Sequence, residues 1–459
     1  MVRKKKIVIM GLGLHGGGIG AANYFIDKGC SVTITDLKAK KELEDSLRRL
    51  KSSKDVRLVL GRHEFPDFEN ADLVVKNPAV PPSSPYLAAA RSRGVPVDSD
   101  IGLFFDIVKE RTDNIIGITG TKGKSTTSAL IHAVFRRKYP GTLLCGNITV
   151  SVFDVLHRIE RNNYLVMELS SFQLGDIREK KISPRICVFT SFMEDHLDRY
   201  SGMDDYFSDK AVLYERQRPG DVLIYNRDGV LPGLIRPNRG VKAWTFGMSQ
   251  DFKGPGAYLE NGVICIRTKE GWRKVVDSSR MRLLGEHNRY NVLAAVCTAS
   301  AEGVPPGEIA DAVENFRGLE HRLEWVGERK GVSFYNDSSA TNPAAAQAAI
   351  RSFPGPVTLI AGGSDKDLGL SGFACDIRDR VTRLLLLDGT GTRRLQEETG
   401  VEGGVFTDFE VAVRHAFEVT PPGGVVLLSP GFASFGMFEN EFHRGREFKR
   451  IVRQIIGTE

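Results

Sequence analysis

Long apolar runs are missing from this sequence of 459 residues. The first apolar segment follows three lysines at positions 4–6 and ends at Gly11. It is too short for the core of a secretory signal or for a membrane span, so the sequence predicts neither. We therefore expect a cytoplasmic protein that has no membrane partner.

Closely spaced cysteines are also missing. The six cysteines are scattered along the chain, and none belongs to a C-x-x-C pair. Such spacing is typical neither of a disulfide framework nor of a zinc site. We expect reduced thiols in the hydrophobic core, as is usual for cytoplasmic proteins.

Basic tracts interleaved with aromatic residues are absent too. The chain has 63 basic and 57 acidic residues, and its net charge of +6 is spread along its length. An excess this small and dispersed favours acidic small molecules only mildly, and it predicts no nucleic-acid partner. The hydrophobic fraction of 41% and the charged fraction of 26% are those of ordinary soluble proteins.

One stretch, Gly-Thr-Lys-Gly-Lys-Ser-Thr at 120–126, gives the strongest functional signal. It follows a short apolar run that predicts a buried strand, and it opens a predicted helix that ends at Lys138. Its glycines let the backbone approach a polyphosphate, and the helix N-terminus supplies a positive pole. Lys124 would reach the outer phosphates, and the Ser125 hydroxyl would ligate a phosphate-bound magnesium ion. Ile118 stands where the full G-x-x-x-x-G-K-[ST] motif has glycine, so we interpret the stretch as a compact nucleotide-phosphate loop.

A second glycine-rich loop lies near the N-terminus. A predicted strand feeds Gly-Leu-Gly-Leu-His-Gly at 11–16, and a helix and a second strand follow, ending at Asp36. A βαβ unit with these features is a dinucleotide fingerprint. Two interpretations stay open. The loop binds NAD in an oxidoreductase, or it binds another diphosphate whose sugar or base hydrogen-bonds to Asp36.

The length predicts about three domains. Strands alternate with helices in each part, so the sequence predicts an α/β protein. We expect a Rossmann-like domain at 1–109, a phosphate-loop ATPase-like domain at 110–318 and a second Rossmann-like domain at 319–459. Residues 222–226 and the Gly-rich hairpins of 242–276 are interpreted as a strand-rich structural appendage.

Polar residues follow the apolar strands of the second and third blocks. Glu168 closes one strand, where phosphate-loop folds place a magnesium ligand, and polar residues at 170–173 crowd beside it. The run Glu-Asp-His-Leu-Asp at 194–198 ends the next strand, and it suits a hard cation and proton transfer. Four strands of the third block also end in polar segments, which predicts a binding face at one sheet edge.

Together these motifs resemble the Mur ligases, ATP-dependent amide ligases that add amino acids to the peptidoglycan precursor. The resemblance covers essentially the whole chain, and it is carried in order by Gly120–Ser125, Glu168–Leu174, Glu194–Tyr200, His287-Asn288, His321-Arg322, Asn336–Asn342 and Ser429–Ser434. The Asp-Ser-x-Ala-Thr-Asn and Gly-Leu-Gly-Leu variants are most similar to the members that join D-glutamate to UDP-N-acetylmuramoyl-L-alanine.

The resemblance implies successive domains for the UDP-linked substrate, for ATP and for the amino acid, together with two magnesium sites. The implied catalytic residues are Lys124, His196 and Lys210, the last of them carbamylated. The implied metal ligands are Ser125, Glu168, His196 and Lys210. ATP would be held by Gly120, Thr121, Gly123, Lys124, Ser125, Thr126, Asn288, Asn291, Arg322 and Asp337. The two other substrates would be held by Leu14, His15, Asp36, Asn147, Thr341, Lys366, Ser434 and Phe435. We expect a monomer.

Two residues depart from the family pattern. Lys122 stands where asparagine is usual, which adds positive charge near the phosphates without removing a ligand. Ser339 stands where the D-glutamate enzymes usually carry lysine, although Lys366 could meet a side-chain carboxylate in its place. The identity and chirality of the amino acid therefore stay open at this point.

Three alternative functions follow from the same residues. The first is a sister ligase that uses another amino acid, such as L-glutamate, or a folylpolyglutamate synthase, which the N-terminal βαβ unit disfavours. The second is an NAD-dependent oxidoreductase, inferred from residues 7–36 alone. The third is a protein that binds a nucleotide without catalysis.

Overall fold

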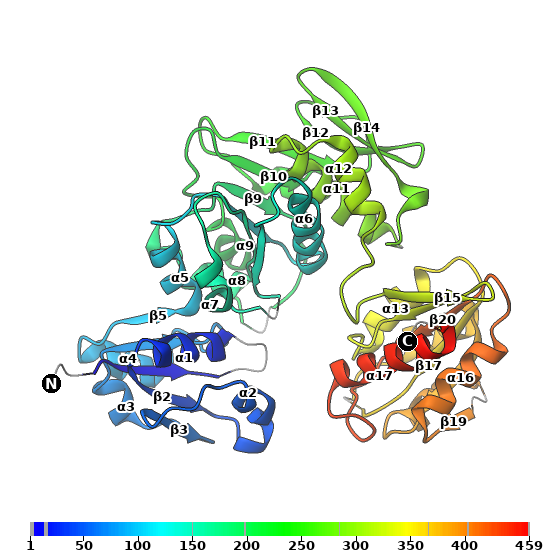
Figure 1. The fold of residues 1–459 in the computed structure, drawn as a ribbon, viewed down its shortest axis with the longest axis horizontal. Coiled ribbons are helices and arrows are strands. Elements are labelled where there is room, and N and C mark those ends of the chain that lie inside the picture. Colours follow the sequence, from blue (N-terminus) through cyan, green and yellow to red (C-terminus); the bar gives the residue numbers. More distant parts are fainter. Residues whose placement is uncertain are drawn as a thin grey trace. The chain divides into compact units, whose positions relative to one another are not determined.

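The computed structural model describes residues 4–12, 17–148, 150–196, 199–283, 285–365, 367–401 and 404–457. These residues form three separate sheets, each with helices against it (Figure 1). The chain divides into two compact units. Residues 1–279 and 290–313 form the first unit, and residues 280–289 and 314–459 form the second.

The first sheet lies at the start of the first unit and is wholly parallel, in the order β3-β2-β1-β4-β5. Its strands are β1 (Lys6–Met10), β2 (Ser31–Asp36), β3 (Val56–Leu60), β4 (Leu73–Lys76) and β5 (Val97–Ser99). Its helices are α1 (Gly17–Asp27), α2 (Glu44–Arg48), α3 (Phe65–Glu69), α4 (Pro85–Ser92) and α5 (Asp100–Val108). This is the predicted βαβ architecture.

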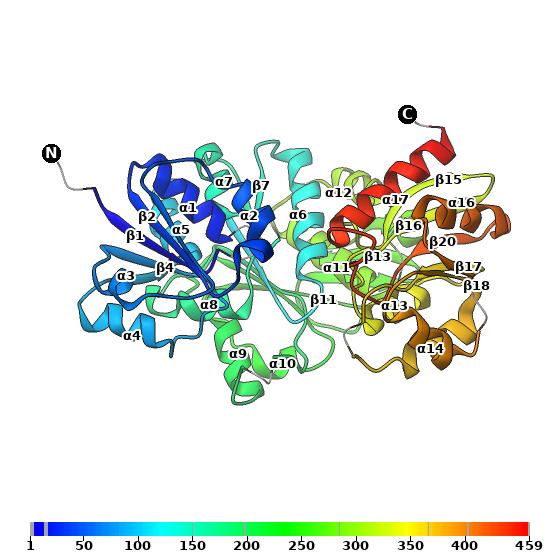
Figure 2. The same ribbon diagram turned by 90° about the horizontal axis from the view of Figure 1, so that it is seen from below.

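Alternation along β1 explains why helices cover both faces of this sheet. Ile7 and Ile9 belong to the core that includes residues of α1 and α5, whereas Val8 and Met10 belong to the core beneath α3 and α4. Successive strand residues point to opposite faces, so an unbroken apolar run requires a layer on each side. Figure 2 shows α1 and α5 on one side of the strands and α3 and α4 on the other.

The second sheet has the order β14-β13-β12-β11-β10-β9-β6-β8-β7. Its strands are β6 (Ile115–Thr119), β7 (Leu143–Gly146), β8 (Leu165–Glu168), β9 (Ile186–Phe189), β10 (Val222–Asn226), β11 (Lys242–Gly247), β12 (Gly256–Glu260), β13 (Val263–Thr268) and β14 (Gly271–Asp277). Its helices are α6 (Lys124–Lys138), α7 (Val152–Val155), α8 (Ser171–Asp176), α9 (Met203–Ala211), α10 (Leu231–Leu234), α11 (Glu286–Ala301) and α12 (Pro306–Glu314).

The segment 242–276 is not the separate appendage that the sequence predicted. Its first strand, β11, pairs in parallel with β10, and β12 pairs in parallel with β11. Only β13 and β14 continue as antiparallel strands. The whole segment therefore extends the central sheet, because β11 finds its partner in a strand of the phosphate-loop core rather than in its own hairpin.

The third sheet belongs to the second unit and has the order β15-β16-β20-β17-β18-β19. Its strands are β15 (Glu324–Arg329), β16 (Val332–Asn336), β17 (Val357–Ala361), β18 (Val381–Leu387), β19 (Gly404–Phe406) and β20 (Val425–Leu428). Its helices are α13 (Pro343–Arg351), α14 (Ser371–Arg380), α15 (Thr392–Thr399), α16 (Phe409–Val419) and α17 (Glu441–Ile456). Only the edge strand β15 pairs antiparallel. One core lies beneath α13 and α14, and the other lies beneath α16 and α17 (Figure 2).

The cysteines follow the prediction in part. Cys145, Cys187, Cys265 and Cys297 are buried, as expected for core thiols, and Cys30 is half-buried. Cys375 is exposed on α14, so the expectation of a core position is wrong for this residue. In the described residues, no helix is both long enough and apolar enough to cross a bilayer.

Candidate active site

The loop of residues 120–123 connects the central strand β6 to α6, and two of its positions require glycine. Gly120 has φ +147°, and a Cβ there would lie 2.1 Å from Thr190 Oγ1. Gly123 has φ +85°, and a Cβ there would lie 2.4 Å from Asn291 Oδ1. Both the backbone angle and the lack of space exclude larger residues. The glycine spacing in the sequence is therefore a packing requirement of this turn.

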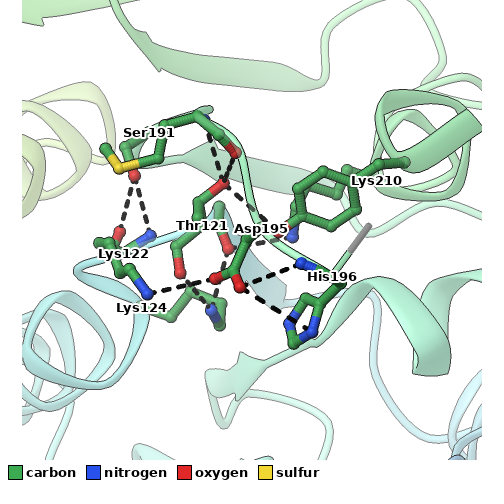
Figure 3. A network of polar contacts seen from close by, with 10 residues as sticks. Thr121, Lys122, Lys124, Ser191, Asp195, His196 and Lys210 are labelled. Atoms are coloured by element: carbon green, nitrogen blue, oxygen red, sulfur yellow. Dashed lines mark hydrogen bonds and ion pairs between the residues drawn. The ribbon is translucent and has the colours of Figure 1, made fainter. Parts of the chain in front are cut away.

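The loop backbone is held by the segment that follows β9. The Thr121 amide donates to Ser191 O at 2.8 Å, and the Lys122 amide donates to Ser191 Oγ at 2.9 Å. The Thr190 hydroxyl donates to Lys122 O at 2.7 Å. These contacts, several of which are drawn in Figure 3, fix the loop before any ligand arrives. A loop held in this way presents the amides that follow it, at the N-terminus of α6, in a fixed arrangement that suits phosphate binding.

Lys124 is the first residue of α6, and its side chain folds over the loop. Its Nζ donates to Gly120 O at 2.9 Å and to Thr121 O at 3.0 Å. Ser125 and Thr126 follow in the first helical turn and are half-buried. The structure therefore brings the predicted phosphate-binding residues together around one helix N-terminus.

Replacing Gly123 with alanine is expected to weaken ATP binding while leaving the rest of the fold intact. Backbone strain of this kind costs about 1–3 kcal/mol, which corresponds to roughly a 5- to 150-fold weaker affinity if the loop must deform to accept phosphate. Calorimetric titration with ATP measures this change. Gly307→Ala is the matched control, because a Cβ at that position in α12 meets open space. Equal ATP affinities of the two variants would contradict the loop assignment.

Glu168 lies at the end of β8, which pairs with β6. Its side chain is 2% exposed, and its Oε1 accepts a hydrogen bond from Asn147 Nδ2 at 3.1 Å. Ser170 and Gln173, which were expected to lie beside Glu168, form hydrogen bonds with each other at the start of α8. Ser170 caps α8, with the Gln173 amide donating to Ser170 Oγ and Gln173 Oε1 accepting from the Ser170 amide. Ser170 and Gln173 form a capping box, so their proximity to Glu168 serves the start of α8.

Lys210 lies on α9 and is 1% exposed. Its Nζ donates to Gly120 O at 3.0 Å and lies 4.5 Å from the centroid of the Tyr206 ring. Burial, with a further contribution from the Lys124 ammonium, lowers the pKa of Lys210 to about 7. A large fraction of this amine is therefore neutral and nucleophilic at neutral pH.

His196 lies in the turn after β9 in a left-handed conformation, with φ +56°. Its ring is 5.1 Å from the Phe172 ring and 5.9 Å from the Tyr206 ring, measured between centroids. Its amide donates to Asp195 Oδ1 at 3.1 Å. Tyr206 belongs to none of the motifs identified in the sequence, although it stands four residues before Lys210. This spacing places the Tyr206 and Lys210 side chains on one helix face.

Asn291 lies on α11 and contacts the first turns of α6, where its Oδ1 accepts from Thr127 Oγ1 at 3.2 Å. Asn288 lies one turn earlier, and both side chains are 5% exposed. The predicted shared helix face is therefore a buried face. Residues 280–289, Asn288 included, cluster with the second compact unit.

Asp36 ends β2, as predicted, and its two carboxylate oxygens already accept backbone hydrogen bonds. Oδ2 accepts from the Leu12 amide and Oδ1 from the Lys38 amide, each at 2.9 Å. Asp36 thus holds the backbone at Leu12 and Lys38, and a hydrogen bond from a ligand would be an additional one. Leu14 and His15, predicted to contact the UDP-linked substrate, lie outside the described residues.

In the second unit, Asp337 follows β16 and is 7% exposed. Its Oδ2 accepts from Ser429 Oγ at 2.7 Å, and its Oδ1 accepts from the Leu323 amide at 3.1 Å. Burial raises the pKa of Asp337 to about 7. Arg322, the other predicted nucleotide ligand of this unit, is exposed.

The predicted amino-acid residues follow neighbouring strands of the third sheet. A narrow hollow is lined by Thr341, Pro343, Asp365, Leu368, Leu370, Gly431 and Phe432. Ser364 and Ala433 exchange backbone hydrogen bonds at 2.9 and 3.2 Å, which joins the loop after β17 to the loop after β20. Ser434 is buried in the latter loop and Phe435 is 64% exposed, whereas Lys366 lies outside the described residues.

A buried arginine that was not predicted from the sequence connects the loop after β16 to the loop after β20. Arg444 on α17 is 1% exposed, and its guanidinium donates to Ser338 Oγ at 3.0 Å, to Ser338 O at 2.9 Å and to Phe432 O at 3.4 Å. Burial lowers the pKa of Arg444 to about 10. Arg444 stands four residues before Phe448 and seven before Ile451, so helical spacing places it on the apolar face of α17, and that spacing is the signal in the sequence that could have found it.

The donor set around the loop suits magnesium rather than a metal held by the protein alone. Among the described residues, no three His, Cys, Asp or Glu side chains gather to hold an ion. Magnesium is usually bound through one or two carboxylates, with phosphate oxygens and waters completing the octahedron. Glu168, the Ser125 hydroxyl and a phosphate-binding helix N-terminus fit that requirement.

Solved structures define the class of fold. The chain is similar to UDP-N-acetylmuramate-alanine ligase from Thermotoga maritima, with a TM-score of 0.60 and 18% identity over 98% of this chain and 99% of that one. It is also similar to MurF ligase from Thermotoga maritima in complex with ADP, with a TM-score of 0.55 and 15% identity over 93% and 96% of the two chains. At these identities the likeness shows the fold, which is that of three-domain ligases with a central ATPase-like domain.

Sequence comparisons show the family. Residues 5–99 match the Mur ligase MurD-like N-terminal domain, residues 118–299 the Mur ligase middle domain, and residues 321–432 the Mur ligase glutamate ligase domain. A UDP-N-acetylmuramoylalanine–D-glutamate ligase from Roseiflexus sp. (strain RS-1) is 41% identical over 98% of this chain and 99% of its own length. Proteins of the same name from Geobacter metallireducens and Borreliella burgdorferi (strain B31) are 36% and 32% identical, each over 99% of this chain and at least 98% of their own.

This chain belongs to the Mur ligase family. The membership confirms the predicted resemblance. The oxidoreductase interpretation of residues 7–36 is not favoured, because those residues match a Mur ligase N-terminal domain.

Proposed function

We propose that this chain is an ATP-dependent ligase that joins D-glutamate to UDP-N-acetylmuramoyl-L-alanine, releasing ADP and phosphate. The observation that carries the proposal is the preorganised loop 120–123 at the start of α6, with Lys124, Glu168 and Lys210 beside it. The full-length relatives that carry this activity in their names support the choice of substrates.

The loop suits the first chemical step. A carboxylate is a poor acyl donor, so its oxygen first attacks the γ-phosphorus of ATP, the bond to ADP breaks, and an acyl phosphate forms. Lys124 and the loop amides would hold the crowded phosphate oxygens of that step, and the N-terminus of α6 would oppose their negative charge. The amine of D-glutamate then attacks the acyl carbon and expels phosphate. The amine must lose a proton, and the candidate acceptors are a metal-bound group or the His196 imidazole while it is not a metal ligand.

Ser125, Glu168, His196 and Lys210 would hold the two magnesium ions. Bound magnesium would neutralise charge on the transferred phosphoryl group. We propose that Lys210 becomes carbamylated, because about half of its buried amine is neutral near pH 7 and so can attack carbon dioxide, losing a proton as the N–C bond forms. The carbamate converts a buried cation into an oxygen ligand at the position where Nζ now faces Gly120 O.

The third domain would receive the amino acid through Thr341, Lys366, Ser434 and Phe435. The backbone hydrogen bonds between Ser364 and Ala433, which join two of the loops that carry these residues, support this placement. Ser339 leaves the domain without the lysine usual in D-glutamate enzymes, so side-chain recognition would fall to Lys366. We place the reaction in the cytoplasm, in peptidoglycan precursor synthesis, and expect a monomer with small-molecule substrates and no nucleic-acid or membrane partner.

A screen of amino acids tests the proposal. Purified protein is mixed with ATP, magnesium and UDP-N-acetylmuramoyl-L-alanine, and phosphate release is followed with D-glutamate, L-glutamate, D-glutamine or L-lysine added. We expect release with D-glutamate to exceed release with each other amino acid by at least about a hundredfold. D-Glutamine and L-lysine would leave the cation that pairs with the side-chain carboxylate unpaired, and L-glutamate cannot place its amine and both carboxylates where D-glutamate does. Preferred release with L-glutamate would identify a sister ligase, and release with none would refute the activity.

A further inference from the structure

Lys122 has a side chain that leaves the phosphate loop and reaches the acidic turn after β9. The backbone of Lys122 is held in the loop, because its amide donates to Ser191 Oγ and its carbonyl accepts from the Thr190 and Ser191 hydroxyls. The Nζ atom lies 3.1 Å from Asp195 Oδ2, and the two side chains are 67% and 30% exposed (Figure 3). An ion pair this exposed contributes little to folding, so stability does not explain it.

Asp195 connects this ammonium to His196. Its second oxygen, Oδ1, accepts the His196 amide at 3.1 Å and lies 4.0 Å from His196 Nδ1. The carboxylate is thus turned toward Lys122 on one side and toward the imidazole on the other. The imidazole ring lies near the aromatic rings of Phe172 and Tyr206, and the Asp195 carboxylate lies between it and the Lys122 ammonium.

The positive charge of Lys122 acts in opposite directions on the two ligands proposed for this loop, the nucleotide and the divalent cation. An ammonium near the loop attracts a polyphosphate and repels a dication, and it also holds a carboxylate that would otherwise attract the dication. We propose that Lys122, through its ion pair with Asp195, is a positioning residue that strengthens nucleotide binding and weakens divalent-cation binding beside His196. The proposal rests on the proposed function, since it needs nucleotide and metal at this loop.

Two binding measurements on the full-length protein test this inference without turnover. ADP affinity is measured by calorimetry in EDTA, and Mn²⁺ affinity is measured by electron paramagnetic resonance with the metal alone. For Lys122→Met we expect the Kd of ADP to rise and the Kd of Mn²⁺ to fall, each by about three- to tenfold, as one screened charge at this range allows. Lys122→Asn should behave like the methionine variant, and Lys122→Arg should keep both wild-type values.

If Lys122 acts through its charge, its removal changes the affinities for ADP and for Mn²⁺ in opposite directions. If it only holds the loop in place, both affinities change in the same direction. If Lys122 only braced the loop, both affinities would fall together in Lys122→Met, and that result would overturn the inference. Unchanged affinities, or Mn²⁺ binding too weak to detect in every variant, would also overturn it. Lys51→Met is the matched control, because its exposed ion pair with Asp27 lies on the first sheet's domain. Failure of the wild type to bind ADP would instead contradict the proposed function.

Discussion

Replacing Lys124 with alanine is expected to lower kcat by about a thousandfold or more while the protein stays folded. Charge stabilisation of a transferring phosphoryl group is worth factors of this size in enzymes that use a single positioned cation. In the structure the Lys124 ammonium already lies over the loop, bound to two of its carbonyls. Phosphate-release kinetics measure the loss of kcat, and thermal unfolding shows whether the variant stays folded.

Lys138→Ala provides the control for Lys124, because Lys138 ends the same helix and its Nζ donates to Gly303 O at 2.8 Å. Both variants lose one lysine and its hydrogen bonding to backbone carbonyls, which is worth about 1 kcal/mol per bond. Only Lys124→Ala should lose turnover. Activity of that variant within tenfold of the wild type would refute the phosphate role of Lys124.

Replacing Lys210 with methionine is expected to reduce kcat by at least about a hundredfold, because a thioether cannot form a carbamate. Methionine has nearly the same length, so the buried position on α9 stays filled. Lys210→Arg keeps the positive charge but not the nucleophile, and it should be equally inactive. Equal activity of Lys210→Arg and the wild type would exclude a carbamate role.

The carbamate itself is detectable by ¹³C NMR after incubation with labelled bicarbonate. Because burial lowers the pKa of Lys210 to about 7, the amine is mostly protonated at pH 6 and mostly neutral at pH 8. We expect the carbamate signal to grow over that interval and to be absent from Lys210→Met. An amine at its ordinary pKa would remain almost wholly protonated throughout, so a signal that appears only above pH 9 would contradict the buried-amine account.

Short-range patterns made most of the fold predictable. The phosphate loop, its strand and its helix occur where glycine spacing and apolar runs place them, and the βαβ unit ending at Asp36 does as well. Pairing over long distances could not be predicted in the same way. The strands within 242–276 have turn-rich local sequence typical of hairpins, yet β11 pairs with β10 of the central core.

The candidate site shows a similar limit. Residue type and position indicated Lys124 and Glu168, because their chemistry suits phosphate and metal, whereas Lys210 was indicated only by the resemblance to the Mur ligases. It did not indicate that Ser170 and Gln173 cap a helix, nor that both Asp36 oxygens are bound by backbone amides. Local hydrogen bonding uses polar groups that a sequence pattern counts as available, and only coordinates show which groups it uses.

The central claim is that a triphosphate binds where loop 120–123 meets α6. A crystal structure of the full chain with magnesium and a non-hydrolysable ATP analogue tests it most directly. We predict that the β- and γ-phosphates accept hydrogen bonds from the amides of Gly123, Lys124 and Ser125, with Lys124 Nζ moved from the loop carbonyls onto the γ-phosphate. A well-ordered nucleotide bound elsewhere, with this loop unchanged, would contradict the account.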